Sequence, residues 1–268
     1  TWRSGAAGAV PAHLRTISSS ADDAKHALDD LVQACTHQGD LSGVAFAAVP
    51  HLVAMAETVS SSAELGLHAW ALIIAGHTRV AREPPSRVAA DLRAWCDAAC
   101  AEARQWPVAA FPNERSSLAR ALGGLAALHD PRTAYASLLQ SFGDSNDQEV
   151  AVECPACRSE ARVRFDGPEI QVLDVRGDRD RETPTLAEVR VSPDIEVVVA
   201  RGREALARGT AERGDAAVGA VLAAIADARG QAALAEAIVL ALATIDCPCC
   251  DAASFPVVAG VRTALRLG

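Results

Sequence analysis

The chain has 268 residues, of which 50% are hydrophobic, 4% are aromatic and 22% are charged, with a formal net charge of −9. A chain of this length and apolar content can bury a substantial core, which argues against a largely disordered protein. The negative charge argues against a protein whose main task is to hold nucleic-acid phosphate, because such binding depends on neutralisation by Lys and Arg.

No uninterrupted apolar run approaches the length of a membrane span, and residues 1–10 lack the basic start and continuous apolar stretch of a signal peptide. We therefore expect a cytoplasmic protein with no membrane association. Lys25 is the only lysine, and this arginine bias together with the alanine excess is typical of a GC-rich bacterial genome.

The first half of the chain predicts one helix after another. Apolar residues recur there at three- and four-residue spacing. Pro50 predicts a kink in the second helix or a late start of it, and Asn113 is the expected N-cap of the fifth helix. The expected helices cover 22–37, 41–58, 63–80, 87–105, 114–129 and 132–142. The short connections between these helices group them into three antiparallel hairpins. The spacing of the hairpins along the chain is typical of helical repeat proteins.

The pattern changes after residue 143. Polar and apolar residues alternate with a period of two, which predicts short strands over 149–153, 161–165, 169–175 and 188–191. Residues 144–196 hold fourteen acidic residues against seven arginines and so carry −7 of the net charge. Helical spacing returns over 197–207, 216–228, 231–245 and 252–267.

These changes predict three parts. The first is an N-terminal helical array over 1–143, the second an acidic β-rich insertion over 144–196, and the third a C-terminal helical array over 197–268.

The segment Ala45-Phe-Ala-Ala-Val-Pro-His-Leu-Val53 resembles the proline-bearing helix of a HEAT-type repeat. The chain as a whole resembles the HEAT-like, armadillo-type helical repeat proteins of bacteria. This resemblance implies a mainly α fold, an α-solenoid of antiparallel helix hairpins, interrupted here by a zinc-ribbon-like insertion. It implies no catalytic residue.

Two short cysteine motifs are the strongest chemical signal in the sequence. They are Cys154-Pro-Ala-Cys157 and Cys247-Pro-Cys-Cys250, with 89 residues between them. Each motif presents two sulfurs from one tight turn, and four thiolates suit a tetrahedral zinc ion. We therefore predict a structural zinc site formed by Cys154, Cys157, Cys247 and Cys250, which pins the insertion to the last helical hairpin.

Alternatives to this site stay open at the level of sequence. Cys249 can replace Cys247 or Cys250 as a ligand, and iron can replace zinc. The motifs also occur in thiol–disulfide enzymes, and they can form two disulfides or two half-sites completed by another chain. The remaining cysteines, Cys35, Cys96 and Cys100, are expected to stay reduced and packed.

A second candidate site lies in the first two predicted hairpins, where polar residues are expected to converge on one helical face. Its residues are His37, Gln38, His51 and His68, which we treat as candidate ligand-binding residues. The alternative interpretation is that each histidine caps a helix or lies at the rim of the core.

These features favour a binding scaffold with a structural zinc site and a protein or peptide partner, for example an inhibitor or immunity-type protein whose acidic surface meets a basic target. The alternative is an enzyme on a HEAT-like scaffold. It would be a natural-product tailoring enzyme or resemble a DNA glycosylase, with a pocket on the N-terminal helical face.

Overall fold

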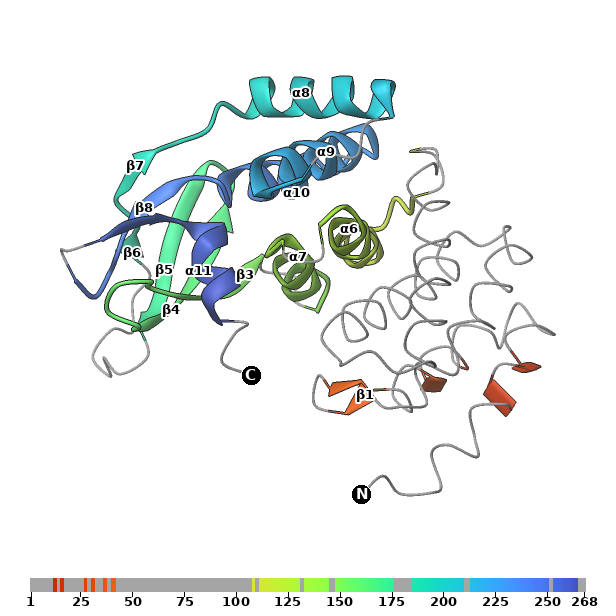
Figure 1. Cartoon of the computed structure of the whole chain (residues 1–268), viewed down its shortest axis with the longest axis horizontal. Coiled ribbons are helices and arrows are strands. Elements are labelled where there is room, and N and C mark those ends of the chain that lie inside the picture. Colours follow the sequence, from red (N-terminus) through yellow and green to blue (C-terminus); the bar gives the residue numbers. More distant parts are fainter. Residues whose placement is uncertain are drawn as a thin grey trace. The chain divides into compact units, whose positions relative to one another are not determined.

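A computed structural model of the chain falls into two compact units, Thr1–Phe111 and Pro112–Gly268 (Figure 1). The structure describes residues 12–13, 15–16, 27, 30–31, 36–37, 40–41, 108, 111–130, 133–144, 148–175, 185–209, 213–250 and 253–264.

In the first unit, β1 (Thr36–His37) pairs antiparallel with β2 (Asp40–Leu41). The prediction of a helix over 22–37 is therefore wrong at its C-terminal end. The helices predicted over 63–80 and 87–105 lie outside the described residues, as does the segment 45–53 that resembles a HEAT helix.

The second unit combines helices with two antiparallel sheets. One sheet has the strand order β3-β4-β5-β6 and the other the order β7-β8-β9. Its helices are α6 (Arg115–His129), α7 (Tyr135–Asp144), α8 (Ile195–Arg208), α9 (Asp215–Ala228), α10 (Ala232–Leu240) and α11 (Val257–Ala264). Its strands are β3 (Glu149–Glu153), β4 (Glu160–Asp166), β5 (Glu169–Val175), β6 (Thr185–Leu186), β7 (Val189–Val191), β8 (Thr244–Asp246) and β9 (Ser254–Pro256).

The predicted mainly α fold, a HEAT-like solenoid, is wrong: the part of the chain that the structure describes is a mixed α/β fold. The error has its origin around the second cysteine motif. Helices were predicted over 231–245 and 252–267, but α10 ends at Leu240, and β8 and β9 pair with Ile245 opposite Phe255. A strand of three residues is too short to show a period of two, so the flanking apolar residues resembled the ends of two helices.

Other predicted elements are confirmed. The strands expected over 149–153 and 169–175 are β3 and β5 with the same bounds. The helix expected over 216–228 is α9, which begins one residue earlier.

The N-cap of α6 differs from the prediction. Glu114, rather than Asn113, holds that position and accepts hydrogen bonds from the backbone N–H groups of Ser116 and Ser117. Although partial burial raises the pKa of Glu114, these hydrogen bonds lower it to about 2.

The core of the second unit is built on α9 and α10. Every residue of α9 from Ala217 to Ala226 is buried, as expected for a helix that is apolar on all sides. Tyr135 of α7 is fully buried, and its hydroxyl donates to the carbonyl of Ile238 in α10 at 2.8 Å. The helices therefore form one packed block.

Two contacts attach the first sheet to this block. Gln148, which directly precedes β3, donates through Nε2 to the carbonyl of Ala233 in α10 at 3.1 Å. Phe142 of α7 meets Phe165 of β4 edge to face, with ring centroids 5.6 Å apart. The hairpin that carries the first cysteine motif is thus held against the helices.

Helix α8 lies along α9 (Figure 1), and a glycine permits the close approach. A Cβ atom at Gly202 would lie 1.9 Å from the carbonyl oxygen of Ala220, which no rearrangement of side chains can relieve. We therefore expect Gly202→Ala to destabilise the protein by about 1–3 kcal/mol, measured by urea unfolding. The direction of the change in the free energy of unfolding is the test, since Gly→Ala in an unobstructed helix stabilises a protein by up to about 1 kcal/mol. If Gly202→Ala stabilised the protein, the close packing of α8 on α9 at this position would be contradicted.

Candidate metal centre

The first cysteine motif closes the hairpin formed by β3 and β4. Cys154 follows β3 directly, its N–H donates to the carbonyl of Ser159 at 3.0 Å, and its own carbonyl accepts from the N–H of Arg158 at 3.0 Å. Arg158 adopts a left-handed conformation with φ of 64°. These bonds wrap the backbone into a tight loop that holds Cys154 and Cys157 on one hairpin end.

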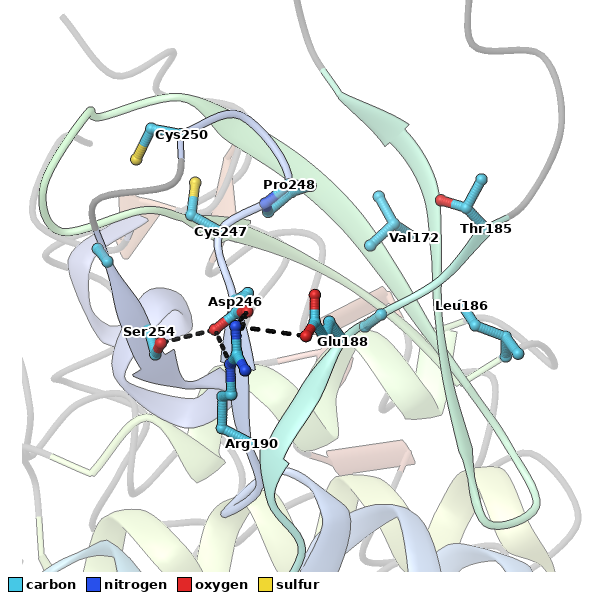
Figure 2. Close-up of a pocket in the computed structure, with 12 residues that line it drawn as sticks. Val172, Thr185, Leu186, Glu188, Arg190, Asp246, Cys247, Pro248, Cys250 and Ser254 are labelled. Atoms are coloured by element: carbon cyan, nitrogen blue, oxygen red, sulfur yellow. Dashed lines mark hydrogen bonds and ion pairs between the residues drawn. The ribbon is translucent and has the colours of Figure 1, made fainter.

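The second motif repeats this arrangement at the end of the β8–β9 hairpin. Cys247 follows β8, and its N–H donates to the carbonyl of Ala253 at 2.9 Å. The N–H of Cys249 donates to Cys247 Sγ at 3.3 Å. Figure 2 shows the Cys247 and Cys250 side chains pointing toward each other across the loop. Each motif is therefore a loop between two antiparallel strands.

A single extended segment brings the two hairpins together. Its first part, β6, pairs with β5, and the N–H of Ala187 extends this pairing to the carbonyl of Ile170 at 2.8 Å. The segment then changes partner: the carbonyl of Glu188 accepts from the N–H of Asp246 at 2.9 Å, and β7 pairs with β8. Both sheets are thus connected through residues 185–191.

The result is a cluster of four thiols from the two loops. The sulfur atoms of Cys154, Cys157, Cys247 and Cys250 all lie within 4.8 Å of one another. Cys157 Sγ and Cys247 Sγ are 3.7 Å apart, far beyond the length of a disulfide bond of about 2.05 Å. Four free thiols at this spacing are compatible with a bound metal ion.

The four thiols differ in their surroundings. Cys154 and Cys247 are buried, Cys250 is half-buried and Cys157 is exposed. Hydrogen bonds from Ser159 lower the pKa of the Cys157 thiol to about 6, whereas burial raises the pKa of Cys247 far above its usual range. A metal that binds all four as thiolates displaces their protons.

The loop of the first motif is also tied by a buried charge. The side chain of Glu153 is only 1% exposed and lies 2.9 Å from the guanidinium of Arg158. Burying a carboxylate is costly unless a cation compensates it. The ion pair therefore stabilises the turn between Cys154 and β4.

Beside the second motif lies an open groove of about 430 Å³, to which Cys247 and Cys250 both contribute. Arg190 of β7 forms an ion pair with Asp246, with Nε 2.8 Å from Oδ2, and Ser254 donates to the same carboxylate at 2.6 Å (Figure 2). The hydrogen bond from Arg190 is the main cause that lowers the pKa of Asp246. This network fixes the residue directly before Cys247.

The structure thus brings together the four cysteines that the motif spacing predicted as ligands. Cys249 is exposed, and its backbone rather than its sulfur is seen to contact Cys247. The predicted ligand-binding site in the first half of the chain stays a prediction. His37 lies in β1, and Gln38, His51 and His68 lie outside the described residues.

Sequence reasoning missed the supporting charges. Asp246 and Arg190 are 56 residues apart, so no local pattern connects them. For Glu153 the sequence predicted the opposite, since the alternation of β3 buries Val150 and Val152 and would leave Glu153 on the exposed side, where acidic residues usually lie.

Comparison with protein-family models, with curated proteins and with solved structures finds no match to this chain. Nothing in these comparisons therefore bears on the resemblance to HEAT-like repeat proteins. Among the described residues, every helix is too short or too polar to cross a membrane. The compartment stays a prediction.

The buried ion pair generates a test. We expect Arg158→Ala to lower the free energy of unfolding by about 1–3 kcal/mol, because it leaves the Glu153 carboxylate buried without its cation. Because Ala and Arg both carry a Cβ atom, the left-handed backbone conformation at position 158 is equally unfavourable in the wild type and in the variant. In a Glu153→Met background the Arg158→Ala change should have little effect in urea unfolding; an undiminished effect there would disprove the pairing.

Proposed function

We propose that the four cysteines hold a structural zinc ion and that the second unit is a zinc-stabilised binding module. A tetrahedral zinc–thiolate centre with Zn–S bonds of about 2.3 Å has sulfur–sulfur distances of about 3.8 Å. The distance of 3.7 Å between Cys157 Sγ and Cys247 Sγ fits that edge. This agreement is the observation that carries the proposal for the metal.

A structural role is favoured by the number of ligands. Four thiolates fill the tetrahedral shell and leave no position for a water molecule or substrate, unlike a catalytic zinc site, which keeps one open. The metal would instead join the β3–β4 and β8–β9 hairpins. Iron in the same four-thiolate shell is the alternative, and metal analysis distinguishes the two.

The binding role rests on an apolar surface next to the centre. We call it the β6–β7 surface and define it by the large apolar side chains that these two strands expose: Leu186 (66%), Val189 (39%) and Val191 (61%). Exposed apolar residues that gather in one short segment mark interaction sites more often than scattered ones do.

The chemistry of this surface points to an extended peptide as partner. β7 is the edge of its sheet and pairs with β8 on one side only among the described strands. A peptide can add a further strand to such an edge and place alternate apolar side chains on Val189 and Val191. Exposed Glu188, Asp194 and Glu196 favour basic residues in the partner.

Metal content tests the first part. Protein purified without added metal or chelator should carry about one zinc per chain, measured by inductively coupled plasma mass spectrometry. The double variant Cys154→Ser/Cys157→Ser should lose it and unfold more easily, because metal binding at such sites contributes to folding.

Cys249→Ser is the matched control, since it removes a thiol from the same loop and should leave the zinc content unchanged. Stoichiometric iron would contradict zinc. A metal-free wild-type protein would contradict the centre itself.

Peptide selection tests the second part. Zinc-loaded protein screened against a displayed random-peptide library should enrich peptides with alternating apolar residues and Lys or Arg. Leu186→Asp/Val191→Asp should weaken these peptides by about tenfold or more in fluorescence polarisation, which corresponds to about 1.4 kcal/mol.

The matched control is Ala200→Asp/Ala207→Asp, which adds the same charges at exposed positions of α8 and should leave affinity unchanged. Equal weakening by both double variants would show that the peptides bind elsewhere or respond only to charge.

A further inference from the structure

The groove beside the second cysteine motif is continuous with the β6–β7 surface. Leu186 belongs to both, since it lines the groove and is 66% exposed. Glu188 lines the groove as well, two residues further along the same extended segment. Side chains at alternate positions of an extended segment lie on one face. A ligand on the β6–β7 surface can therefore reach into the groove past Leu186 and Glu188.

The charged side chains of the groove have one carboxylate in excess. They are Glu188, Arg190 and Asp246. Both oxygens of Asp246 are occupied, because Oδ1 accepts from Ser254 at 2.6 Å and Oδ2 accepts from Arg190 at 2.8 Å. The side chain of Glu188 is 68% exposed, and its contact among the described residues is with Arg190, through Oε1 at 3.3 Å. The Glu188 carboxylate therefore has room for a further cation.

The proposed metal centre adds negative charge to the same groove. Cys247 and Cys250 both line it. Four thiolates outweigh the two positive charges of a zinc ion, so the filled centre is a dianion. A cation that binds Glu188 is attracted by this centre too, whereas an anion is repelled.

The apolar part of the groove decides which kind of cation fits. Val172, Leu186 and Pro248 line it together with Glu188 (Figure 2). Arginine and lysine carry a methylene stem that packs on apolar surface while the charged head reaches a carboxylate. A hydrated metal ion would gain nothing from these apolar walls. The groove therefore fits a basic side chain better than a small cation.

We propose that this groove is the specificity pocket of the peptide site and holds one arginine or lysine side chain of the partner, with its charged head on Glu188. This inference rests on the proposed function, the binding of an extended peptide along β7.

The strand geometry supplies the route for this side chain. β7 begins at Val189, directly after Glu188. Residues opposite each other on paired antiparallel strands have Cβ atoms about 5 Å apart, which is within reach of a salt bridge. In a peptide added to β7, the residue opposite Glu188 adjoins the one that packs on Val189 but points to the other face. The partner should therefore carry its basic residue next to an apolar one.

The experiment uses the zinc-loaded full-length chain and a displayed library of short peptides. The peptides carry valine at alternate positions, and the positions between the valines are randomised. Selection on the wild-type protein should enrich Arg or Lys at one randomised position. Selection on Glu188→Gln should retain peptides with the valine frame but lose the enrichment at that position. The zinc content of Glu188→Gln should equal that of the wild type, because Glu188 is not a metal ligand.

A double-mutant cycle then tests the pairing itself. One enriched peptide is compared in fluorescence polarisation with a copy in which the basic residue is replaced by Gln. On the wild-type protein this replacement should weaken binding by about three- to fivefold, the range of an ion pair between partly exposed side chains. On Glu188→Gln the same replacement should have little effect, because the partner of the basic residue is already absent.

Glu204→Gln is the matched control. It removes the same charge from an exposed position of α8 outside the groove and should behave as the wild type. If Glu204→Gln weakened the basic peptide as much as Glu188→Gln does, the preference would come from the overall charge of the protein, and the specificity pocket would be wrong.

The outcomes separate this inference from the proposed function. If peptides with the valine frame bind the wild type without a preferred basic position, or if Glu188→Gln keeps that preference, the pocket is wrong while the peptide site stands. If no peptide of the library binds the zinc-loaded protein, the peptide site itself is wrong and the pocket falls with it.

Discussion

The meeting of four cysteine sulfurs from two distant loops is the constraint on which the second unit depends. Cys154 and Cys157 are separated from Cys247 and Cys250 by most of the unit, and a few ångströms of displacement in either hairpin would disperse the cluster. Contacts around each loop hold the two hairpins in place. One segment pairs with both sheets, and Arg190 fixes Asp246 beside Cys247.

The helical block gives these hairpins a rigid base. Gln148 attaches the start of β3 to α10, while α11 covers β3 from the other end of the chain. At Gly260 a Cβ atom would lie 2.8 Å from the ring of Phe255 and 3.1 Å from Val152 Cβ, so α11 contacts both hairpins at once. The four-cysteine cluster therefore lies where the two β hairpins and the last helix converge.

The sequence allowed the centre to be predicted better than the fold around it. The spacing within each cysteine motif identifies a turn that presents two sulfurs, and this local chemistry does not depend on the rest of the chain. The strands β3 and β5 were also predictable, because strands of five and seven residues are long enough to show their period of two. By contrast, β8 and β9 have only three residues each and are stabilised by pairing: β8 pairs with β9 on one side and with β7 on the other. Such pairing is a tertiary effect, and the alanine-rich helices on either side concealed it.

X-ray absorption at the zinc edge of the purified protein tests the central claim most directly. The account predicts a shell of four sulfur atoms at about 2.3 Å and no nitrogen or oxygen neighbour at bonding distance. A shell with fewer sulfurs, completed by nitrogen or oxygen, would show that the two cysteine loops do not close on one ion and would contradict the account.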